Sequence, residues 1–341
     1  MKVLILKPSS LGDVLQALPV LRLIKQHRPE SEIHWWIDSS LTSLLEGDPD
    51  LAGLIPFERR RWGSPRRWGE VWHSIQLIRR LRFDWVIDLQ SLLRSATVAW
   101  LANGGRTVGL ADPREGAAAF YDVAVPRPSR LTHAVEWYLR VLPELGVPVH
   151  TRFDWLPARP AVVGEIRARW NPQAEAGPWI ALQPAARWDN KRWPVESYQR
   201  IVQSLAARHP QIRFAILGSR DDQALAQAVA SAGPGRCVDL SGQTTLPQLI
   251  EWLRLCSVLV TNDTGPMHAA AALGKPVVGI FGPTEPRRTG PYGQMEHVLQ
   301  DRSIPCVPCM KSTCRWTPRL ACLTAISPTT VLQHIESLLR L

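Results

Sequence analysis

Short apolar runs alternate with longer stretches of helical periodicity along the whole chain. In the first half, the apolar runs predict buried strands at 2–7, 32–37, 84–89 and 107–109, with a shorter one near residue 54. The stretches between them predict helices at 13–27, 41–46, 69–81, 92–102 and 130–145. This alternation is typical of a mostly parallel sheet with helices on both faces.

The same alternation returns after a proline-rich segment at 146–160, which we interpret as a linker. Further strands are predicted at 179–183, 212–217, 237–240, 257–260 and 277–281. Further helices are predicted at 195–207, 221–232, 246–255, 266–273 and 328–341. A chain of 341 residues exceeds the size at which one core usually stops growing. We therefore predict an α/β protein with an N-terminal domain at 1–158, a C-terminal domain at 159–326 and a final helix at 327–341.

Composition narrows the class of protein. Apolar residues make up 45% of the chain and charged residues 21%, as in a soluble globular protein. No apolar stretch is long enough to span a membrane, and the first apolar run is too short for a signal peptide, so we expect a cytoplasmic protein. The net charge of +10 predicts an anionic partner, which could be nucleic acid, an acidic membrane surface or a phosphorylated substrate.

Tryptophan is unusually frequent, with 15 copies against six phenylalanines and four tyrosines. Several tryptophans stand beside arginines in the segment Glu58–Ser74. One interpretation is a solvated helix and loop in which arginines shield the aromatic rings. The other is a basic, amphipathic surface that contacts anionic lipid headgroups, because tryptophan and arginine suit a water–membrane interface.

The most informative segment is Thr261–Pro286, TNDTGPMHAAAALGKPVVGIFGPTEP. Its pattern predicts a buried strand, a tight polar loop, an alanine-rich helix and a second buried strand. Asp263, Thr264 and Gly265 therefore stand where a parallel strand leads into a helix N-terminus, a place that favours an anion such as phosphate. An ordinary turn with Asp263 or Thr264 as the helix cap would give the same spacing.

Several common catalytic signatures are absent from the sequence. It contains neither the glycine-rich dinucleotide fingerprint nor the P-loop, which argues against a dehydrogenase or a P-loop NTPase. The nucleophile elbow and the His-Glu-x-x-His zinc motif are also missing. Asp48 and Asp50 flank Pro49, so we interpret them as part of a turn and not as a magnesium site.

Six motifs, taken in order along nearly the whole chain, resemble the lipopolysaccharide heptosyltransferases of glycosyltransferase family 9. They are KPSSLGDVLQALPVLRLIK (Lys7–Lys25), VIDLQSLLRSA (Val86–Ala96), DNKRWP (Asp189–Pro194), LGSRDD (Leu217–Asp222), the segment Thr261–Pro286 and GPYG (Gly290–Gly293). The resemblance implies a GT-B fold, in which two Rossmann-like doubly wound domains face a central cleft. It implies a donor bound mainly by the C-terminal domain and an acceptor bound by the N-terminal one.

The resemblance also implies a reaction. The enzyme would move heptose from ADP-L-glycero-D-manno-heptose to the inner core of lipopolysaccharide with inversion at the anomeric centre, and no cofactor or metal would be required for transfer. It would act as a peripheral protein at the cytoplasmic face of the inner membrane, with no nucleic-acid partner. The arginines at 59–67 and the pair Arg114–Glu115 resemble the type that adds the first heptose, so Arg59, Arg60, Arg61 and Arg114 are the expected acceptor-binding residues.

Glycosyl transfer requires a base for the acceptor proton and positive charge for the departing diphosphate. By resemblance, Asp13 is the base, although an acidic residue in a first helical turn also complements the helix dipole. Lys191 is the expected clamp on the diphosphate, assisted by Arg187, although one subfamily has Thr-Thr where this chain has Ala186-Arg187.

The remaining donor-binding residues follow from the same resemblance. Asp263, Thr264, Gly265 and His268 are expected to hold the diphosphate and the heptose. Asp222, or its neighbour Asp221, is expected to bind the ribose of the nucleotide.

The cysteines raise a separate question. Four of the six cluster at Cys306, Cys309, Cys314 and Cys322. In a cytoplasmic protein such a cluster is more often metal-binding than disulfide-forming, and four thiolates suit a structural Zn²⁺ ion. The alternative is a set of reduced thiols that pack a loop. Cys237 and Cys256 fall in strand and helix patterns and are expected in the core.

Two other functions remain compatible with the sequence. One is a member of the same family that uses another donor or acceptor sugar. The other is a basic, non-catalytic protein on a Rossmann-like scaffold that binds anionic glycolipid or nucleic acid. The joint presence of Asp13, Lys191 and Asp263 favours the enzyme, because a binding protein requires no base.

Overall fold

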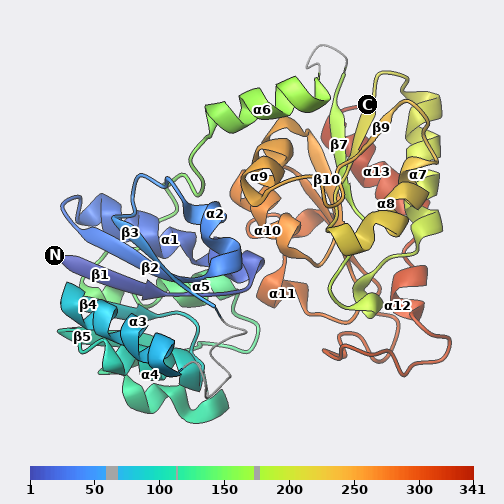
Figure 1. Cartoon of the computed structure of the whole chain (residues 1–341). Helices are drawn as coiled ribbons and strands as arrows, with labels where there is room; N and C mark the ends of the chain where they lie inside the picture. The colour runs from blue at the N-terminus through green and yellow to red at the C-terminus, as the bar shows by residue number, and fades with distance from the viewer. Residues whose placement is uncertain (59–67, 113, 173–176) are drawn as a thin grey trace. The chain divides into compact units, whose positions relative to one another are not determined.

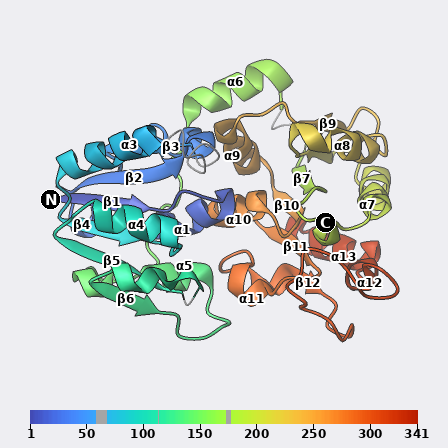
Figure 2. The same ribbon diagram turned by 60° about the horizontal axis from the view of Figure 1, so that its bottom comes forward.

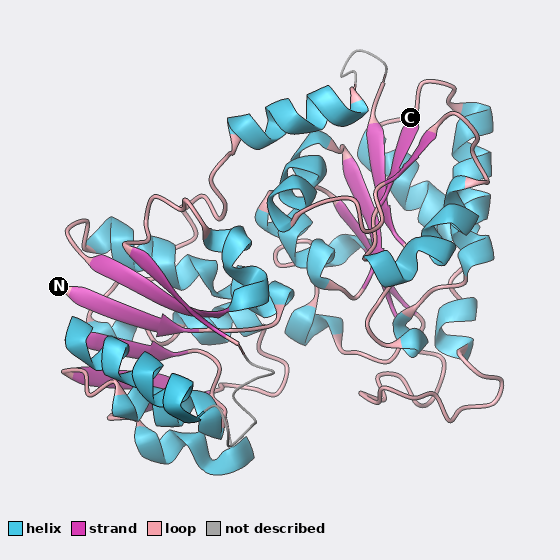
Figure 3. Cartoon of the chain, viewed as in Figure 1, coloured by secondary structure: helices cyan, strands magenta, loops and turns pink. Residues whose placement is uncertain are grey.

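The computed structural model describes residues 1–58, 68–112, 114–172 and 177–341. The chain divides into two compact units, unit 1 at Met1–Pro157 and unit 2 at Ala158–Leu341. Each unit contains one parallel sheet of six strands. Helices and strands alternate through both (Figures 1 and 3), as the sequence pattern predicts.

The sheet of unit 1 has the strand order β3-β2-β1-β4-β5-β6. Its strands are β1 (Lys2–Leu6), β2 (Glu32–Asp38), β3 (Gly53–Phe57), β4 (Trp85–Asp88), β5 (Arg106–Ala111) and β6 (Val123–Pro126). Its helices are α1 (Leu11–His27), α2 (Thr42–Leu45), α3 (Trp68–Leu81), α4 (Leu93–Leu101) and α5 (Ala134–Leu139), with 3₁₀ segments η1 (Ser39–Leu41), η3 (Arg114–Phe120) and η4 (Pro143–Leu145). The order reverses between β1 and β4, where ligands of such sheets bind.

Alternation along the strands of unit 1 builds its core. Leu4 and Leu6 of β1 join Trp36 of β2 in one apolar cluster, to which α3 contributes Ile78 and α4 contributes Val98. Helices α3 and α4 therefore cover one face of this sheet, whereas α1 and α5 pack together on the other (Figure 1).

Unit 2 repeats this topology with the order β12-β11-β10-β7-β8-β9. Its strands are β7 (Trp179–Gln183), β8 (Arg213–Ile216), β9 (Cys237–Asp239), β10 (Val258–Asn262), β11 (Val277–Phe281) and β12 (Val298–Gln300). Its helices are α6 (Pro160–Trp170), α7 (Val195–Arg208), α8 (Gln223–Ala230), α9 (Leu246–Leu255), α10 (Gly265–Ala272), α11 (Pro286–Thr289), α12 (Ala321–Thr324) and α13 (Pro328–Leu339), with 3₁₀ segments η6 (Asp189–Lys191), η7 (Arg220–Asp222) and η8 (Met295–His297). The reversal of strand order lies between β7 and β10.

Helices cover both faces of the second sheet (Figure 2). On one face α7 contacts α8 and α13, and on the other α9 contacts α6 and α10. The ring of Trp252 in α9 packs edge-on against Trp170 and Trp179. Together with the fully buried Trp35 and Trp193, these rings show that much of the tryptophan content fills the cores.

The structure corrects three expectations about the elements. The helix expected at 130–145 is two short pieces, α5 and η4, because Pro143 interrupts the helical hydrogen bonding. The segment interpreted as a linker ends where α6 begins, with a proline in its first turn, and this helix was not predicted. The short edge strands β6 and β12 were also not predicted.

Candidate active site

The loops that follow β7, β10 and β11 meet at the point in unit 2 where the strand order reverses. Lys191 lies in η6 after β7, and its Nζ is 2.6 Å from Oδ2 of Asp263, which follows β10 directly. Thr284, which lies beyond β11, donates its hydroxyl proton to the same Oδ2 at 2.7 Å. The side chains of Lys191 and Asp263 are 17% and 8% exposed. A largely buried ion pair therefore stands where nucleotides bind in sheets of this topology.

Asn262, the last residue of β10, binds the segment that follows β7 at two points. Its Oδ1 accepts the backbone N–H of Trp193 at 3.1 Å, and its Nδ2 donates to the carbonyl of Pro184 at 2.8 Å. The side chain is fully buried, so both bonds are protected from water. The sequence analysis missed Asn262 and Thr284. Their position inside the motif TNDTG and beside Glu285 was the only sequence signal that could have revealed them.

The N-terminus of α10 adds backbone donors to the same region. Thr264 is the N-cap residue, Gly265 begins the helix and Pro266 lies in its first turn. Thr264 does not use its hydroxyl to cap the helix, and its Oγ1 lies 3.3 Å from that of Thr261. His268 follows on the first turn and is half-buried. Asp263, Thr264, Gly265 and His268 are thus brought together, and the first-turn N–H groups favour an anion.

The other predicted donor residues lie on neighbouring loops. Arg187 is exposed in the loop after β7. Asp222 in η7 accepts the backbone N–H of Ser219 at 2.9 Å and its hydroxyl at 2.5 Å, so this carboxylate caps the turn after β8. Asp221, the alternative ribose ligand, is exposed.

In unit 1, Asp13 is the third residue of α1 and is half-buried. Its Oδ2 accepts the backbone N–H of Ser10 at 2.9 Å and the Ser10 hydroxyl at 2.7 Å. The carboxylate therefore forms part of a capping box at the start of α1. The sequence analysis gave this residue two roles, the base or a first-turn charge that complements the helix dipole, and it did not foresee the capping hydrogen bonds. Catalysis stays a prediction.

Lys7, which the sequence analysis did not single out, is a buried ammonium at the end of β1. Its side chain donates from Nζ to the carbonyl of Leu89 at 3.0 Å and lies over the ring of Tyr138 at 4.9 Å. Burial opposes its charge, but Tyr138 and Asp13 more than offset this effect, so the pKa of Lys7 lies above its usual value. A permanent positive charge therefore stands near Asp13.

A pocket of about 200 Å³ lies where the strand order of unit 1 reverses. Pro8 and Ser9 line it from the end of β1, and Gln90 and Arg94 line it from the segment after β4. The buried Oε1 of Gln90 has no hydrogen-bond partner among the described residues. An unmatched acceptor of this kind suits a ligand hydroxyl.

The structure does not describe the side chains of the four expected acceptor arginines. Arg59, Arg60 and Arg61 lie outside the described residues, as does the side chain of Arg114. Its neighbour Glu115 lines the pocket of unit 1 and accepts the backbone N–H of Leu93 at 2.9 Å. Asp48 and Asp50, interpreted as a turn, both bind the buried Arg22.

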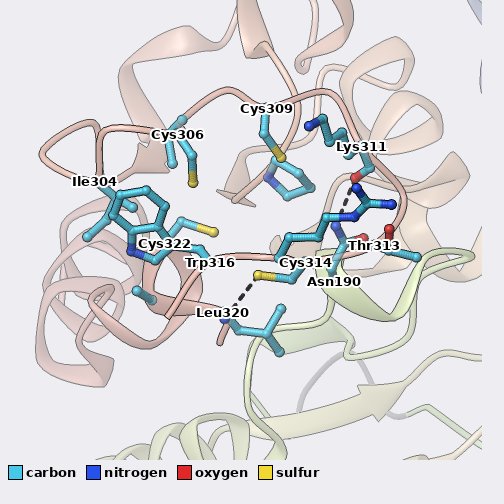
Figure 4. Close-up of a pocket in the computed structure, with 14 residues that line it drawn as sticks. Asn190, Ile304, Cys306, Cys309, Lys311, Thr313, Cys314, Trp316, Leu320 and Cys322 are labelled. Carbon is cyan, nitrogen blue, oxygen red and sulfur yellow. Dashed lines mark hydrogen bonds between the residues drawn. The ribbon is translucent and has the colours of Figure 1, made fainter. Parts of the chain in front are cut away.

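The four clustered cysteines line one pocket of about 180 Å³ in unit 2 (Figure 4). Among the described residues, no group of three or more His, Cys, Asp or Glu side chains is arranged to hold a metal ion as it stands. The other two cysteines lie elsewhere, Cys256 buried and Cys237 half-buried. Burial raises the pKa of the Cys256 thiol to about 12 and that of Cys237 to about 11, as expected for packing residues.

Comparison with known proteins identifies relatives along the whole chain. The model of glycosyltransferase family 9 (heptosyltransferase) matches residues 71–319. Lipopolysaccharide heptosyltransferase 1 of Pseudomonas aeruginosa is 26% identical, over 99% of this chain and 98% of that protein. Lipopolysaccharide heptosyltransferase 1 of Escherichia coli K12 is 27% identical, over 88% of this chain and 93% of that protein.

Solved structures agree with these relatives. The E. coli heptosyltransferase WaaC with ADP has a TM-score of 0.75 at 26% identity, over 99% of this chain and 100% of that one. The E. coli ADP-heptose lipopolysaccharide heptosyltransferase II has a TM-score of 0.80 at 22% identity, over 100% and 99% of the two chains. The predicted α/β architecture of GT-B type, with two doubly wound parallel sheets, is thereby confirmed.

Proposed function

Because the chain belongs to glycosyltransferase family 9, the heptosyltransferases, we propose that it moves heptose from ADP-L-glycero-D-manno-heptose to the inner core of lipopolysaccharide with inversion. The family resemblance predicted from the motifs is confirmed, and the protein is a glycosyltransferase. We further propose that transfer requires no cofactor, as the family resemblance implies. The finer identity of donor, acceptor and linkage is our proposal.

The observation that best supports the proposal is the group formed by Lys191, Asp263 and Thr284 beside the N-terminus of α10. In the proposed complex, the diphosphate of the donor lies against the first-turn N–H groups of α10. Lys191 then divides its charge between Asp263 and the phosphates, and Arg187 adds a second cation. These groups stabilise the negative charge of ADP as it departs, so transfer proceeds without a metal ion.

The second half of the reaction is assigned to unit 1. The acceptor hydroxyl loses its proton to Asp13 while its oxygen attacks the anomeric carbon on the side opposite ADP. The new glycosidic bond forms as the bond from that carbon to the diphosphate breaks, which inverts the configuration. Lys7 holds a positive charge close to the carboxylate that is proposed to accept the proton.

The acceptor is proposed to occupy the pocket of unit 1. The unmatched Oε1 of Gln90 would accept a sugar hydroxyl, and the exposed Arg94 would bind an acidic group of the inner core. Arg59, Arg60, Arg61 and Arg114 remain proposed acceptor residues on the basis of the sequence. Arginine suits this task because its planar guanidinium matches carboxylate and phosphate geometry.

Unit 1 is also proposed to rest on an anionic lipid surface. Among the described residues, no helix combines the length and apolar character of a membrane span. However, Trp72 on α3 and Leu93 and Trp100 on α4 are 54%, 46% and 60% exposed. A groove of about 610 Å³ between these helices is lined by Trp72, Leu93 and Arg94.

We define the α3–α4 face as Trp72, Leu77, Leu93 and Trp100 with the exposed cations Arg79, Arg80 and Arg94. Its mixture of apolar rings and arginines complements anionic headgroups.

The test of the proposed function is direct. Purified protein is incubated with ADP-heptose and an octulosonic-acid inner-core acceptor, and ADP release is measured together with product mass and linkage. We expect ADP release that depends on the acceptor and a product heavier by one heptose with inverted configuration. Release of ADP with another acceptor alone would assign a different substrate. Binding of both compounds without any product would leave the non-catalytic function.

A further inference from the structure

The segment between β12 and α12 is the longest irregular stretch that the structure describes. Residues 301–320 form only turns and bends before α12 begins at Ala321. Ile304 and Val307 of this loop pack against the core of unit 2. Ordering each further residue costs roughly 1–2 kcal/mol of backbone entropy, which a bound ligand would help to offset. Three cysteines lie in this loop, and the fourth, Cys322, lies in the first turn of α12.

All four thiols line the same pocket. Cys306, Cys309, Cys314 and Cys322 line the pocket of about 180 Å³, and Figure 4 shows their sulfur atoms directed toward its interior. The backbone N–H of Leu320 already donates to the sulfur of Cys314 at 3.4 Å. Hydrogen bonds of this kind to a coordinating atom orient metal ligands in known sites.

The charges around the pocket suit a metal–thiolate complex. Four thiolates and one divalent ion carry a net charge of about −2, as the formal charges of such a site require. Lys311 and Arg315 line the same pocket and provide two positive charges. Both residues are exposed, so water solvates these cations when the thiols are protonated, and they are available to a thiolate complex when the thiols are not.

From this arrangement we propose that Cys306, Cys309, Cys314 and Cys322 close around one thiophilic metal ion of the Zn²⁺ class, which orders residues 301–322. On binding, each of the four thiols releases its proton to solvent and one metal–sulfur bond forms per cysteine, with no change in oxidation state. The loop must contract around the ion, because the thiols are not arranged to hold one as they stand. Coupling of metal binding to such ordering is a general property of structural zinc sites.

Two hydrogen bonds connect this loop to the donor site. The carbonyl of Lys311 accepts the side-chain amide of Asn190 at 2.8 Å, and Asn190 is the residue before Lys191. The backbone N–H of Met310 donates to the carbonyl of Pro283 at 2.7 Å, and Pro283 is the residue before Thr284. The proposed metal loop therefore supports two of the three residues of the group around Asp263.

The experiment compares metal content and stability in the full-length protein, purified without a metal-affinity tag from cells grown with added zinc. We expect about one zinc ion per chain and a melting temperature that falls by several degrees after chelation and recovers when Zn²⁺ is returned. Cys309→Ser and Cys314→Ser should each lose the ion. Cys237→Ser and Cys256→Ser are the matched controls, because they remove thiols of the same unit outside the pocket, and they should retain it.

Visible absorption distinguishes iron, which is coloured in thiolate sites, from colourless zinc, and either ion at one per chain supports the site. A metal-free protein whose melting temperature does not respond to added Zn²⁺ or to chelation would overturn the proposal. Equal metal content in the pocket variants and in the controls would overturn it as well. Because these measurements do not depend on transfer, they stand or fall separately from the proposed function.

Discussion

At the scale of single residues, two carboxylates named by the sequence accept hydrogen bonds from hydroxyl groups that the sequence analysis did not identify. Asp263 binds Thr284 in addition to Lys191, and Asp13 binds Ser10. These partners matter for mechanism because substrate must enter existing hydrogen bonds. A diphosphate near Lys191 competes with Asp263, and an acceptor hydroxyl near Asp13 competes with Ser10. In the proposed reaction, each substrate group therefore replaces a hydrogen bond that the free protein already has.

The catalytic assignment of Asp13 can be separated from its role as a helix cap. Asn in place of Asp13 keeps an oxygen that accepts from Ser10, but it cannot take a proton. A positioned base typically contributes ~10²–10⁴-fold to rate, so we expect Asp13→Asn to lower kcat by about that factor while the KM for ADP-heptose changes little. If the residue only complements the helix dipole, the variant should lose ~0.3–1 kcal/mol of stability and retain its kcat. Turnover and melting temperature are measured on the same preparation, and near-normal turnover with reduced stability would reject the base.

The proposed role of Lys191 predicts a different kinetic pattern. Lys191→Met removes the ammonium and keeps much of the apolar stem. We expect the KM for ADP-heptose and the dissociation constant of ADP to rise at least tenfold, because a charge-assisted contact to phosphate is worth about 1.5–3 kcal/mol. The KM for the acceptor should change little. Arg208→Met is the control, since Arg208 is a half-exposed cation of unit 2 whose partner is Glu336. Unchanged ADP affinity in Lys191→Met would remove this residue from the donor site.

At the scale of elements, the sequence predicted best where burial was complete. Strands β1, β7, β10 and β11 are buried along nearly their whole length, so their apolar runs stand out from the flanking segments. Strands β6 and β12 lie at sheet edges with partly exposed residues, and they therefore lack a continuous apolar signal. Helix α6 was hidden for a related reason: of its 11 residues only Ile166 is buried. The prolines near its start are typical both of a linker and of a first helical turn, so they did not reveal the helix.

Helix α11 shows how a short element near the donor site depends on pH. Glu285 is its N-cap, accepts the backbone N–H of Arg287 at 3.2 Å and also binds Arg302 at 3.0 Å. Hydrogen bonds from Arg287 are the main reason that the pKa of this carboxyl is lowered from 4.5 to about 2. A carboxyl with a lowered folded-state pKa stabilises the protein above its unfolded pKa, and this contribution is lost as the pH falls toward the folded value.

Glu285→Gln should therefore be less stable than the parent protein at pH 7, and the difference should narrow as the pH falls from about 4.5 toward 2. Urea unfolding of both proteins at a series of pH values measures this difference. Glu296→Gln is the control, because Glu296 is an exposed carboxylate of the same unit and should show a small difference at every pH. A stability difference for Glu285→Gln that stays constant down to pH 3 would contradict the assigned cause.

At the scale of the whole molecule, the site was predictable to the extent that it lies in contiguous motifs. Asp263, Thr264, Gly265 and His268 are neighbours in sequence, so one motif located them together. Partners that come from different loops could not be found this way. Thr284 meets Asp263 across 21 positions, and Lys7 meets Leu89 across 82. Such pairs follow from the order of strands in the sheet, which local periodicity does not specify.

Part of the net charge of +10 lies on the α3–α4 face, where Arg79, Arg80 and Arg94 are exposed. The sequence left two interpretations of the tryptophan and arginine residues near α3, and part of that segment lies outside the described residues. Many tryptophans prove to be core residues, whereas Trp72 and Trp100 are exposed on the α3–α4 face. The proposed membrane contact rests on these exposed rings and on the arginines of this face, and the solvated interpretation is the alternative that the next experiment tests.

Membrane binding through this face can be measured with vesicles. We expect the protein to sediment with phosphatidylcholine vesicles that contain phosphatidylglycerol, and much less with phosphatidylcholine alone, because the arginines require anionic headgroups. Burying two tryptophan rings contributes several kcal/mol, so the double variant Trp72→Ser, Trp100→Ser should weaken vesicle binding at least tenfold. The control, Leu131→Ser with Val149→Ser, changes two residues of unit 1 that are 41% and 45% exposed and lie outside α3 and α4. Equal binding by the double variant and the control would place the membrane contact elsewhere. Absence of binding to anionic vesicles by the parent protein would reject a lipid surface as the partner of this face.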